Sequence, residues 1–148
     1  MLLIFAFAGC STQKYGDKYE TLGGSHNEIR KQHNCAKLRV SIRLNLAAQK
    51  HAEYMAKHRN MSHQPSAENT LNYRISRTGY KWSRIGENIA NGQRNTQEVM
   101  KDWMDSPGHK QNILNGSYTD IGMGVAYDIN HIAYWCVVFA TRAQPTNF

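Results

Sequence analysis

The chain has 148 residues, of which 41% are hydrophobic and 20% are charged. This composition is that of an ordinary globular protein and excludes a disordered, collagen-like or coiled-coil chain. A chain of this length forms one domain. Eighteen Lys and Arg against eleven Asp and Glu give a net charge of +7, and the three cysteines are an odd number. The positive charge bears on which molecules the protein binds, and the number of cysteines bears on whether it resides in an oxidising compartment.

The first nine residues, Met1 to Gly9, are uncharged and almost wholly apolar. They are too few for a transmembrane span, which needs about 20 apolar residues. Their composition is typical of the apolar core of a secretory signal, although no basic residue precedes it. The run from Phe7 to Ser11 resembles a bacterial lipoprotein cleavage box, in which the cysteine becomes lipid-modified. We expect Cys10 to be a lipid anchor; the alternative is a frayed apolar terminus with a buried thiol.

If Cys10 carries lipid, Cys35 and Cys136 remain. An oxidising envelope compartment would allow these two cysteines to form a disulfide. Two separate buried thiols are the alternative, because free cysteines are commonly buried.

Residues 12–24 are polar and without periodicity, which predicts a tether, so that the domain begins near Ser25. Ser25-His26-Asn27-Glu28 has the spacing of a capping box and predicts a helix that ends near Gln32 or Cys35. Apolar residues at three- and four-residue steps predict a second helix over residues 44–57.

Residues 60–69 are predicted to be a loop, and a short helix follows over residues 70–77. Residues 86–92 are predicted to be a loop or short strand bounded by glycines. Asn95 and Thr96 can cap another helix, which ends near Asp105 because Pro107 disfavours helical geometry in the residue before it. A short helical piece is expected at residues 110–114.

The last third of the chain is rich in β-branched and aromatic residues. Residues 121–127 and 132–141 are predicted to pair as an antiparallel hairpin across the intervening turn. Helices come first and strands last, which indicates an α+β fold. Gly122 and Gly124 are expected to permit close packing where the first of these strands begins.

Three histidines occupy positions where chemistry is worth considering. His51 lies on the apolar face of the second predicted helix, where a hydrogen-bonded core histidine is the expected role. His63 falls in the loop after that helix. His109 follows a helix end, on a turn of the kind that often carries binding or catalytic groups.

A series of short motifs, in a fixed order, resembles the bacterial branch of the CAP family, also called the SCP domain, whose relatives include cysteine-rich secretory proteins, venom antigen five and pathogenesis-related protein one. The resemblance covers residues 25–142, leaving a tail at residues 143–148. The motifs are His26-Asn27-Glu28-Ile29-Arg30, the helix at 47–56, Met61-Ser62-His63, Gly86-Glu87-Asn88-Ile89-Ala90, Trp103-Met104-Asp105-Ser106-Pro107-Gly108-His109, Asn112-Ile113-Leu114, Tyr118-Thr119-Asp120-Ile121-Gly122-Met123-Gly124 and, near the end, Tyr134-Trp135 and Phe139-Ala140.

The resemblance implies a three-layer α-β-α sandwich with a small, mainly antiparallel sheet, in a protein that is secreted or attached to the cell surface. It also implies a cleft with two histidines and two acidic residues. By position, His63, Glu87 and His109 match three of the four. The second acidic position holds Ser106, with Asp105 its neighbour, so the chain departs from the family pattern there.

Two imidazoles can bind zinc or another divalent cation, and Glu87 can orient one of them or act as a base toward a bound water. The sequence has no HExxH or CxxC spacing, so any metal site depends on the fold and should be weak and open. The alternative is a hydrogen-bond network among His63, Glu87 and His109 that shapes the cleft.

Three functions remain open from the sequence. The first is an envelope-attached or secreted binding module whose cleft holds a small ligand, metal ion, lipid or peptide. The second is a metal-assisted or serine-type hydrolase in which His109 activates Ser106 and Glu87 orients the histidine, although no GxSxG elbow is present. The third is a structural or adhesion role, because fold membership does not specify function.

The basic charge is concentrated in the first third of the chain. Because the fold resemblance does not point to nucleic acid, attraction to anionic lipid head groups or to acidic cell-surface polymers is the better interpretation. We expect a monomer with no nucleic-acid partner.

Overall fold

The computed structural model describes residues 13–67 and 69–144. Residues 1–12, with the signal-like segment and Cys10, and residues 145–148 of the tail lie outside the described part. The described helices are α1 (Gln13–Gln32), α2 (Ile42–His58), α3 (Leu71–Ser76), α4 (Thr96–Asp105) and α5 (Pro107–Leu114). The strands are β1 (Arg39–Val40), β2 (Trp82–Asn91), β3 (Asp120–Tyr127) and β4 (Ala133–Arg142).

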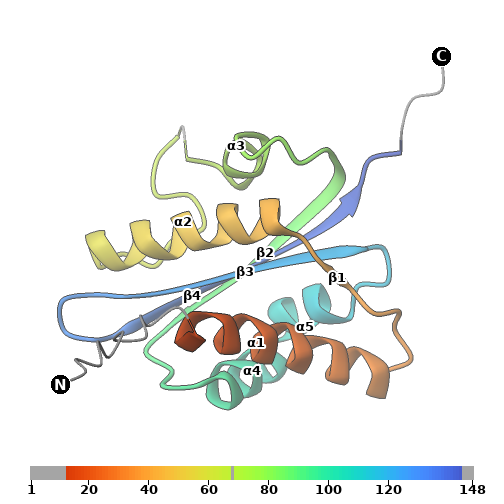
Figure 1. Cartoon of the computed structure of the whole chain (residues 1–148), viewed down its shortest axis with the longest axis horizontal. Coiled ribbons are helices and arrows are strands. Elements are labelled where there is room, and N and C mark those ends of the chain that lie inside the picture. Colours follow the sequence, from red (N-terminus) through yellow and green to blue (C-terminus); the bar gives the residue numbers. More distant parts are fainter. Residues whose placement is uncertain (1–12, 68, 145–148) are drawn as a thin grey trace, which may run out of the picture.

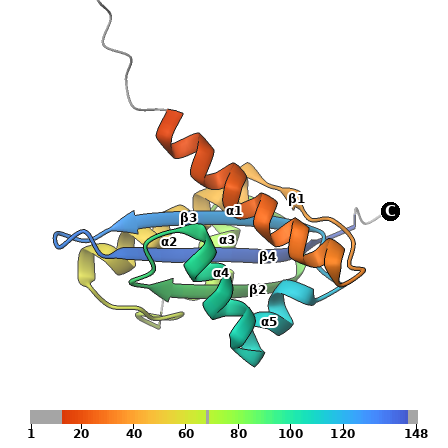
Figure 2. The ribbon, with the colours of Figure 1, turned by 90° about the horizontal axis from the view of Figure 1, so that it is seen from below.

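The strands form one sheet in the order β1-β3-β4-β2. Strand β4 pairs antiparallel with both β2 and β3, whereas β1 pairs parallel with the start of β3. Helices α2 and α3 cover one face of the sheet, and α1, α4 and α5 cover the other (Figure 1, Figure 2). The predicted α+β class and the three-layer sandwich with a small, mainly antiparallel sheet are confirmed.

Strand β4 lies at the centre of the core because both of its faces are covered. Its side chains alternate between the faces, as the two-residue period of a strand requires. Trp135, Val137 and Phe139 pack with α1, α4 and α5. Cys136 and Val138 pack with α2 and α3. One continuous apolar run in the sequence therefore supplies both cores.

The predicted helices at α2, α3 and α4 and the β3–β4 hairpin are confirmed. Asn95 caps α4 as expected, since its side chain accepts a hydrogen bond from the backbone N–H of Glu98 at 2.9 Å. The segment at residues 86–92 is part of a ten-residue strand, because β2 pairs along its whole length with β4. The two-residue strand β1 was not predicted.

The prediction for the start of the first helix was wrong. Helix α1 already begins at Gln13, so the described part of the expected tether is helical. Ser25 lies inside the helix, where its hydroxyl donates to the carbonyl of Thr21 at 2.8 Å and caps nothing. Leu22 and His26 are buried against the sheet. Packing of this face stabilises a helix that the polar sequence by itself does not indicate.

His109 lies in the first turn of α5 rather than on a turn before it. Pro107 is the reason: it occupies the first turn of this helix, where its fixed φ angle suits the geometry and its missing N–H is not needed.

The proposed disulfide between Cys35 and Cys136 does not form, and both thiols are free. The sheet separates them. Cys136 points from β4 into the core under α2. Cys35 follows α1 on the other side of the sheet, where its thiol lies 3.4 Å from the carbonyl oxygen of Leu114.

Gly122 and Gly124 let the backbone of α2 lie directly against β3. An added Cβ at Gly122 would lie 2.1 Å from the carbonyl carbon of Leu44. This approach allows amide side chains of α2 to reach the edge of β3 that β1 leaves unpaired: Asn45 accepts from the N–H of Met123 at 2.9 Å. The expected close packing is confirmed, and it fixes the helix that leads into the His63 loop.

Candidate functional site

A buried carboxylate, Glu87, is the centre of the candidate site. It lies in the middle of β2 with its side chain only 2% exposed. The His63 imidazole donates from Nδ1 to Oε1 at 2.9 Å, and Arg74 Nη2 donates to Oε2 at 2.5 Å. The Cys136 thiol also lies 3.4 Å from Oε2. Both carboxylate oxygens are therefore occupied by groups of the protein.

These contacts keep Glu87 ionised. Burial by itself would raise the pKa of this carboxyl group, because a charge is poorly solvated inside the protein. The hydrogen bond from His63 and the charge of Arg74 outweigh burial and hold the pKa below its usual range. Glu87 is consequently an anion that orients its neighbours, and it is not a free base.

His63 projects from the loop between α2 and α3, and its side chain is 57% exposed. A carboxylate only accepts hydrogen bonds, so the Nδ1 that contacts Glu87 carries the hydrogen. In the neutral ring the lone pair then lies on Nε2. In metal sites and ligand sites, a carboxylate commonly accepts a hydrogen bond from one nitrogen of a histidine and so orients the other nitrogen toward the metal or ligand. Glu87 and Nδ1 of His63 have this arrangement.

Hydrogen bonds between α5 and β2 hold the segment that carries His109 against the strand that carries Glu87. Asn88 donates to the carbonyl oxygen of His109 at 3.0 Å, and Asn112 donates to the side-chain oxygen of Asn88 at 2.9 Å and to the carbonyl oxygen of Glu87 at 3.2 Å. Burial, together with the nearby His63, lowers the pKa of His109. His63 and Glu87 are therefore in direct contact, and His109 lies near enough to His63 for the charge of His63 to lower its pKa.

Arg74 is the residue of the site that sequence reasoning missed. Its side chain is 7% exposed. Besides Glu87 it donates to the carbonyl oxygens of His63, at 3.0 Å, and of Asn69, at 2.9 Å. Arg74 thus joins the His63 loop to the carboxylate. A single arginine in a short helix gives no signal in the sequence. The need for a cationic partner becomes clear only once the structure shows that Glu87 is buried.

The remaining predicted positions are not part of this cluster. His51 is a buried core histidine, as expected, with Nε2 2.9 Å from the carbonyl oxygen of Ser62. Ser106 precedes α5 without a side-chain cap, and no hydrogen bond among the described residues joins it to His109. Asp105 is exposed and pairs with Lys101 at 2.6 Å. The second acidic member of the family pattern therefore has no equivalent at either position.

The described residues contain no group of three or more His, Cys, Asp and Glu side chains placed to hold a metal ion. His63 and His109 are the two ligands on offer, since the oxygens of Glu87 are occupied. Their chemistry fits zinc or a similar cation, which accepts neutral imidazole nitrogens, in an open site completed by water.

Comparison with known proteins identifies the family of this chain. The family model described as CAP, the cysteine-rich secretory protein family, matches residues 24–139. The chain belongs to the CAP family.

Solved structures with a similar fold include two from bacteria. An outer surface protein from Borrelia burgdorferi superposes with a TM-score of 0.78 at 24% identity, covering 84% of this chain and 92% of the Borrelia chain. An extracellular SCP-domain protein from Bacillus anthracis has a TM-score of 0.80 at 24% identity, covering 92% of this chain and 45% of the Bacillus chain. At this identity the likeness is one of fold.

The curated relatives are longer proteins of Bacillus subtilis. The uncharacterized membrane protein YlbC is 31% identical over 112 residues, which are 74% of this chain and 32% of YlbC. The uncharacterized protein YkwD is 52% identical over 46 residues, or 31% of this chain and 18% of YkwD. The matches therefore span about a third or less of these relatives. In the described part of the CAP protein itself, no helix is long and apolar enough to cross a membrane.

Proposed function

We propose that this CAP-domain protein acts at the bacterial cell envelope as a binding module, and that His63 and His109 hold a divalent cation or a small ligand at the open side of the cleft. The observation that carries the proposal is the orientation of His63: buried Glu87 fixes Nδ1, so that Nε2 is the nitrogen left for a ligand. Zinc is the ion to test, because it binds neutral imidazole nitrogens.

The protonation states support this proposal. A metal binds the neutral imidazole, because the protonated ring has no lone pair to donate. Burial and the neighbouring His63 lower the pKa of His109, so its ring is neutral at neutral pH. Glu87 lies behind His63 as an anion and fixes the orientation of the ring it holds.

The hydrolase alternative gains no support from these contacts. A serine-type mechanism needs a hydroxyl within hydrogen-bonding reach of its base. None of the described hydrogen bonds joins Ser106 to His109, and Glu87 is engaged with His63 and Arg74. Hydrolysis through this cleft stays a prediction of the sequence alone.

Attachment to the envelope is the second part of the proposal. Solved relatives include an outer surface protein and an extracellular protein. We propose that Cys10 carries a lipid and that the net charge of +7 favours an anionic membrane surface. The protein would act there as a monomer without nucleic acid. Replacement of Cys10 by Ala should release it from the membrane fraction of expressing cells, and a variant that stays there would rule out this anchor.

Zinc titration by calorimetry tests the cleft. Wild-type protein should bind one zinc ion, and the variant His63→Gln/His109→Gln should bind it at least about tenfold more weakly. The matched control is His33→Gln/His58→Gln, which removes two exposed histidines outside the cleft and should bind as the wild type does. Equal affinity in the two double variants would show that zinc does not use the cleft.

A further inference from the structure

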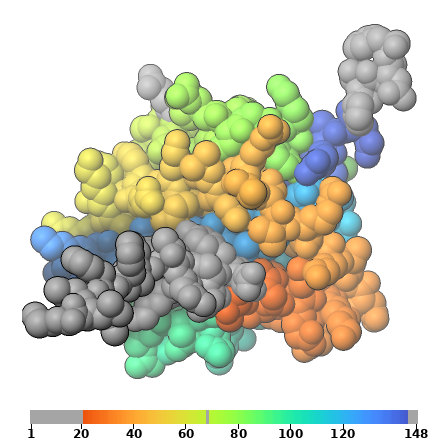
Figure 3. Space-filling model, viewed as in Figure 1, coloured from red at the N-terminus to blue at the C-terminus, as the bar shows by residue number. Residues whose placement is uncertain are grey.

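A hollow lies between α2 and α3, and Arg74 is one of the residues that line it. Its volume is about 400 Å³, within the usual size of small-molecule sites. Helices α2 and α3 adjoin at this surface of the molecule (Figure 3). The residues that matter for its chemistry are Lys50, His51, Tyr54, Tyr73, Arg74 and Arg77.

The described residues that line this hollow carry a net positive charge. Lys50, Arg74 and Arg77 line it, and its described lining residues include no carboxylate. Glu87 balances the charge of Arg74, but neither Lys50 nor Arg77 has an ion-pair partner among the described residues. The guanidinium of Arg77 lies 5.9 Å from the ring centre of Tyr73, so a cation and an aromatic surface occur together. Such a lining suits an anion with an aromatic part.

Two buried polar atoms of the lining have no partner. Arg74 uses both terminal nitrogens, but its Nε–H has no acceptor. His51 contacts the carbonyl oxygen of Ser62 through Nε2, which must therefore carry the hydrogen. Burial lowers the pKa of His51 to about 4, so the ring is neutral and Nδ1 is an acceptor without a donor.

Unpaired donors and acceptors of this kind are costly, at about 1–3 kcal/mol each, and uncommon in folded proteins. Both side chains are more than nine-tenths buried and both line the same hollow. One missing acceptor and one missing donor in the same lining match a ligand that offers an anionic oxygen and a hydroxyl group.

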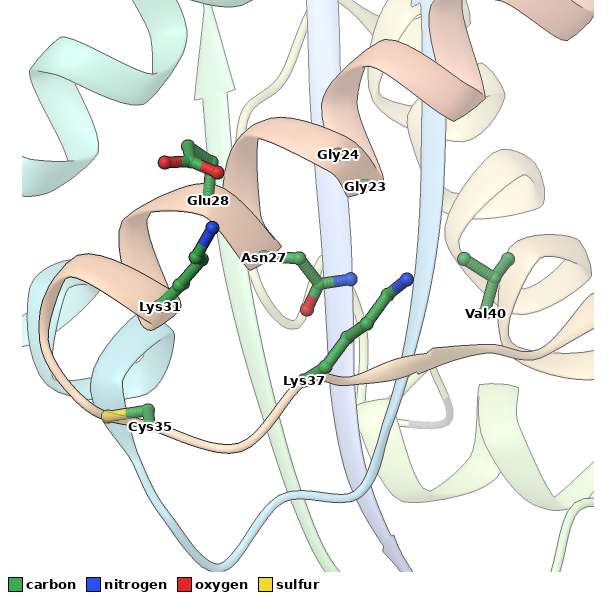
Figure 4. A pocket seen from close by; sticks show the side chains of 8 residues that line it. All are labelled: Gly23, Gly24, Asn27, Glu28, Lys31, Cys35, Lys37 and Val40. Atoms are coloured by element: carbon green, nitrogen blue, oxygen red, sulfur yellow. The ribbon is translucent and has the colours of Figure 1, made fainter.

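The described lining of a second cavity lacks the unpartnered polar atoms of this hollow and serves as a comparison. A space of about 630 Å³ lies between α1 and β1 (Figure 4). Glu28 stands beside Lys31 there and offsets its charge. None of the described residues that line this space has a buried polar atom without a partner. Nothing in its lining indicates a ligand.

We propose that the hollow between α2 and α3 is a binding site for a small aromatic hydroxycarboxylate. Lys50 and Arg77 attract the carboxylate, and Tyr54 and Tyr73 contact the ring. Entry of the ligand exposes the two atoms that are buried without a partner, so that Arg74 Nε donates to the carboxylate and the ligand hydroxyl donates to His51 Nδ1. The site lies beyond the proposed cleft and shares Arg74 with it. A ligand that engages Arg74 Nε would therefore touch the side chain that holds both Glu87 and the His63 loop.

Three probes test the site by calorimetry and by the imidazole ¹⁵N signals of the protein. Mandelate carries the ring, the hydroxyl and the carboxylate; phenylacetate lacks the hydroxyl; benzyl alcohol lacks the carboxylate. We expect mandelate to bind at least about fivefold more tightly than either of the others, since each lacks one charged or neutral hydrogen-bonding group. Mandelate should also shift the His51 signal.

The variant Lys50→Gln/Arg77→Gln should bind mandelate at least about tenfold more weakly. The variant Lys37→Gln/Lys110→Gln removes the same charge from exposed positions outside the hollow and should bind like the wild type. Both variants should unfold at the wild-type temperature, because all four side chains are exposed. Equal weakening in the two variants, equal binding of the three probes, or an unmoved His51 signal would overturn the proposal.

Discussion

Replacement of Gly124 by Ala should separate α2 from β3. The new Cβ would lie 2.4 Å from the backbone N and Cα of Gln49. Non-bonded carbon atoms need about 3.5 Å, so the helix must retreat by roughly 1 Å, and backbone atoms cannot rotate out of the way. The retreat would also break the two hydrogen bonds between the Gln49 amide and the backbone of Val125, at 3.1 and 3.2 Å.

Overpacking and the loss of two hydrogen bonds together cost about 3–5 kcal/mol. For a chain of this size the midpoint of thermal unfolding should fall by roughly 10 °C. Urea and thermal unfolding followed by circular dichroism measure both quantities. Gly116→Ala is the matched control, since its Cβ would meet no atom within 4 Å and the variant should unfold like the wild type. A Gly124→Ala variant as stable as this control would refute the close approach of α2 to β3.

Glu87→Gln should lower the free energy of unfolding by about 3–5 kcal/mol, because it leaves Arg74 buried without its anion. The same substitution should weaken zinc binding by about tenfold or more. A variant with wild-type stability and zinc affinity would contradict the role given to this carboxylate. The second prediction concerns His26, whose pKa burial lowers to about 4. Between pH 6.5 and 4 the His26 ring of the unfolded chain binds a proton that the folded chain does not, so this residue should lower the free energy of unfolding by about 3 kcal/mol, and His51, whose pKa burial also lowers to about 4, adds a fall of its own. Denaturant titrations at pH 7 and pH 4 measure the fall in the free energy of unfolding, which should be smaller by about 1–3 kcal/mol in His26→Leu because this variant lacks the titrating ring. A fall of the same size in the variant and the wild type would contradict the prediction. The third prediction is that a reducing agent leaves the unfolding midpoint unchanged, since Cys35 and Cys136 are free thiols; a midpoint that drops on reduction would show that they pair.

Local patterns predicted those elements whose cause is local. The α4 helix begins where Asn95 offers a side-chain oxygen to Glu98, and such a cap is visible in the sequence. The β3–β4 hairpin follows from β-branched and aromatic residues on both sides of a polar turn. The start of α1 could not be predicted in this way, because the burial of Leu22 and His26 against the sheet stabilises a polar segment.

The same distinction between local patterns and tertiary packing applies to the candidate site. His63, Glu87 and His109 could be named from motifs because their residue types and order carry the resemblance to the CAP family. Arg74 could not be, since its role comes from the loop that folds back over β2. The disulfide prediction failed for a related reason: the count of cysteines is a property of the sequence, whereas their placement on opposite sides of the sheet is not.

The sequence by itself therefore determined the α+β class, most of the helices and strands, and the family, and it named three residues of the candidate site. Short-range capping, hydrophobic periodicity and motif order are enough for these. Only the tertiary structure decided that Glu87 is buried between His63 and Arg74, and so orients a histidine instead of acting as a free base. The state of a carboxylate depends on which charges and how little water surround it, and the packing of distant segments sets both.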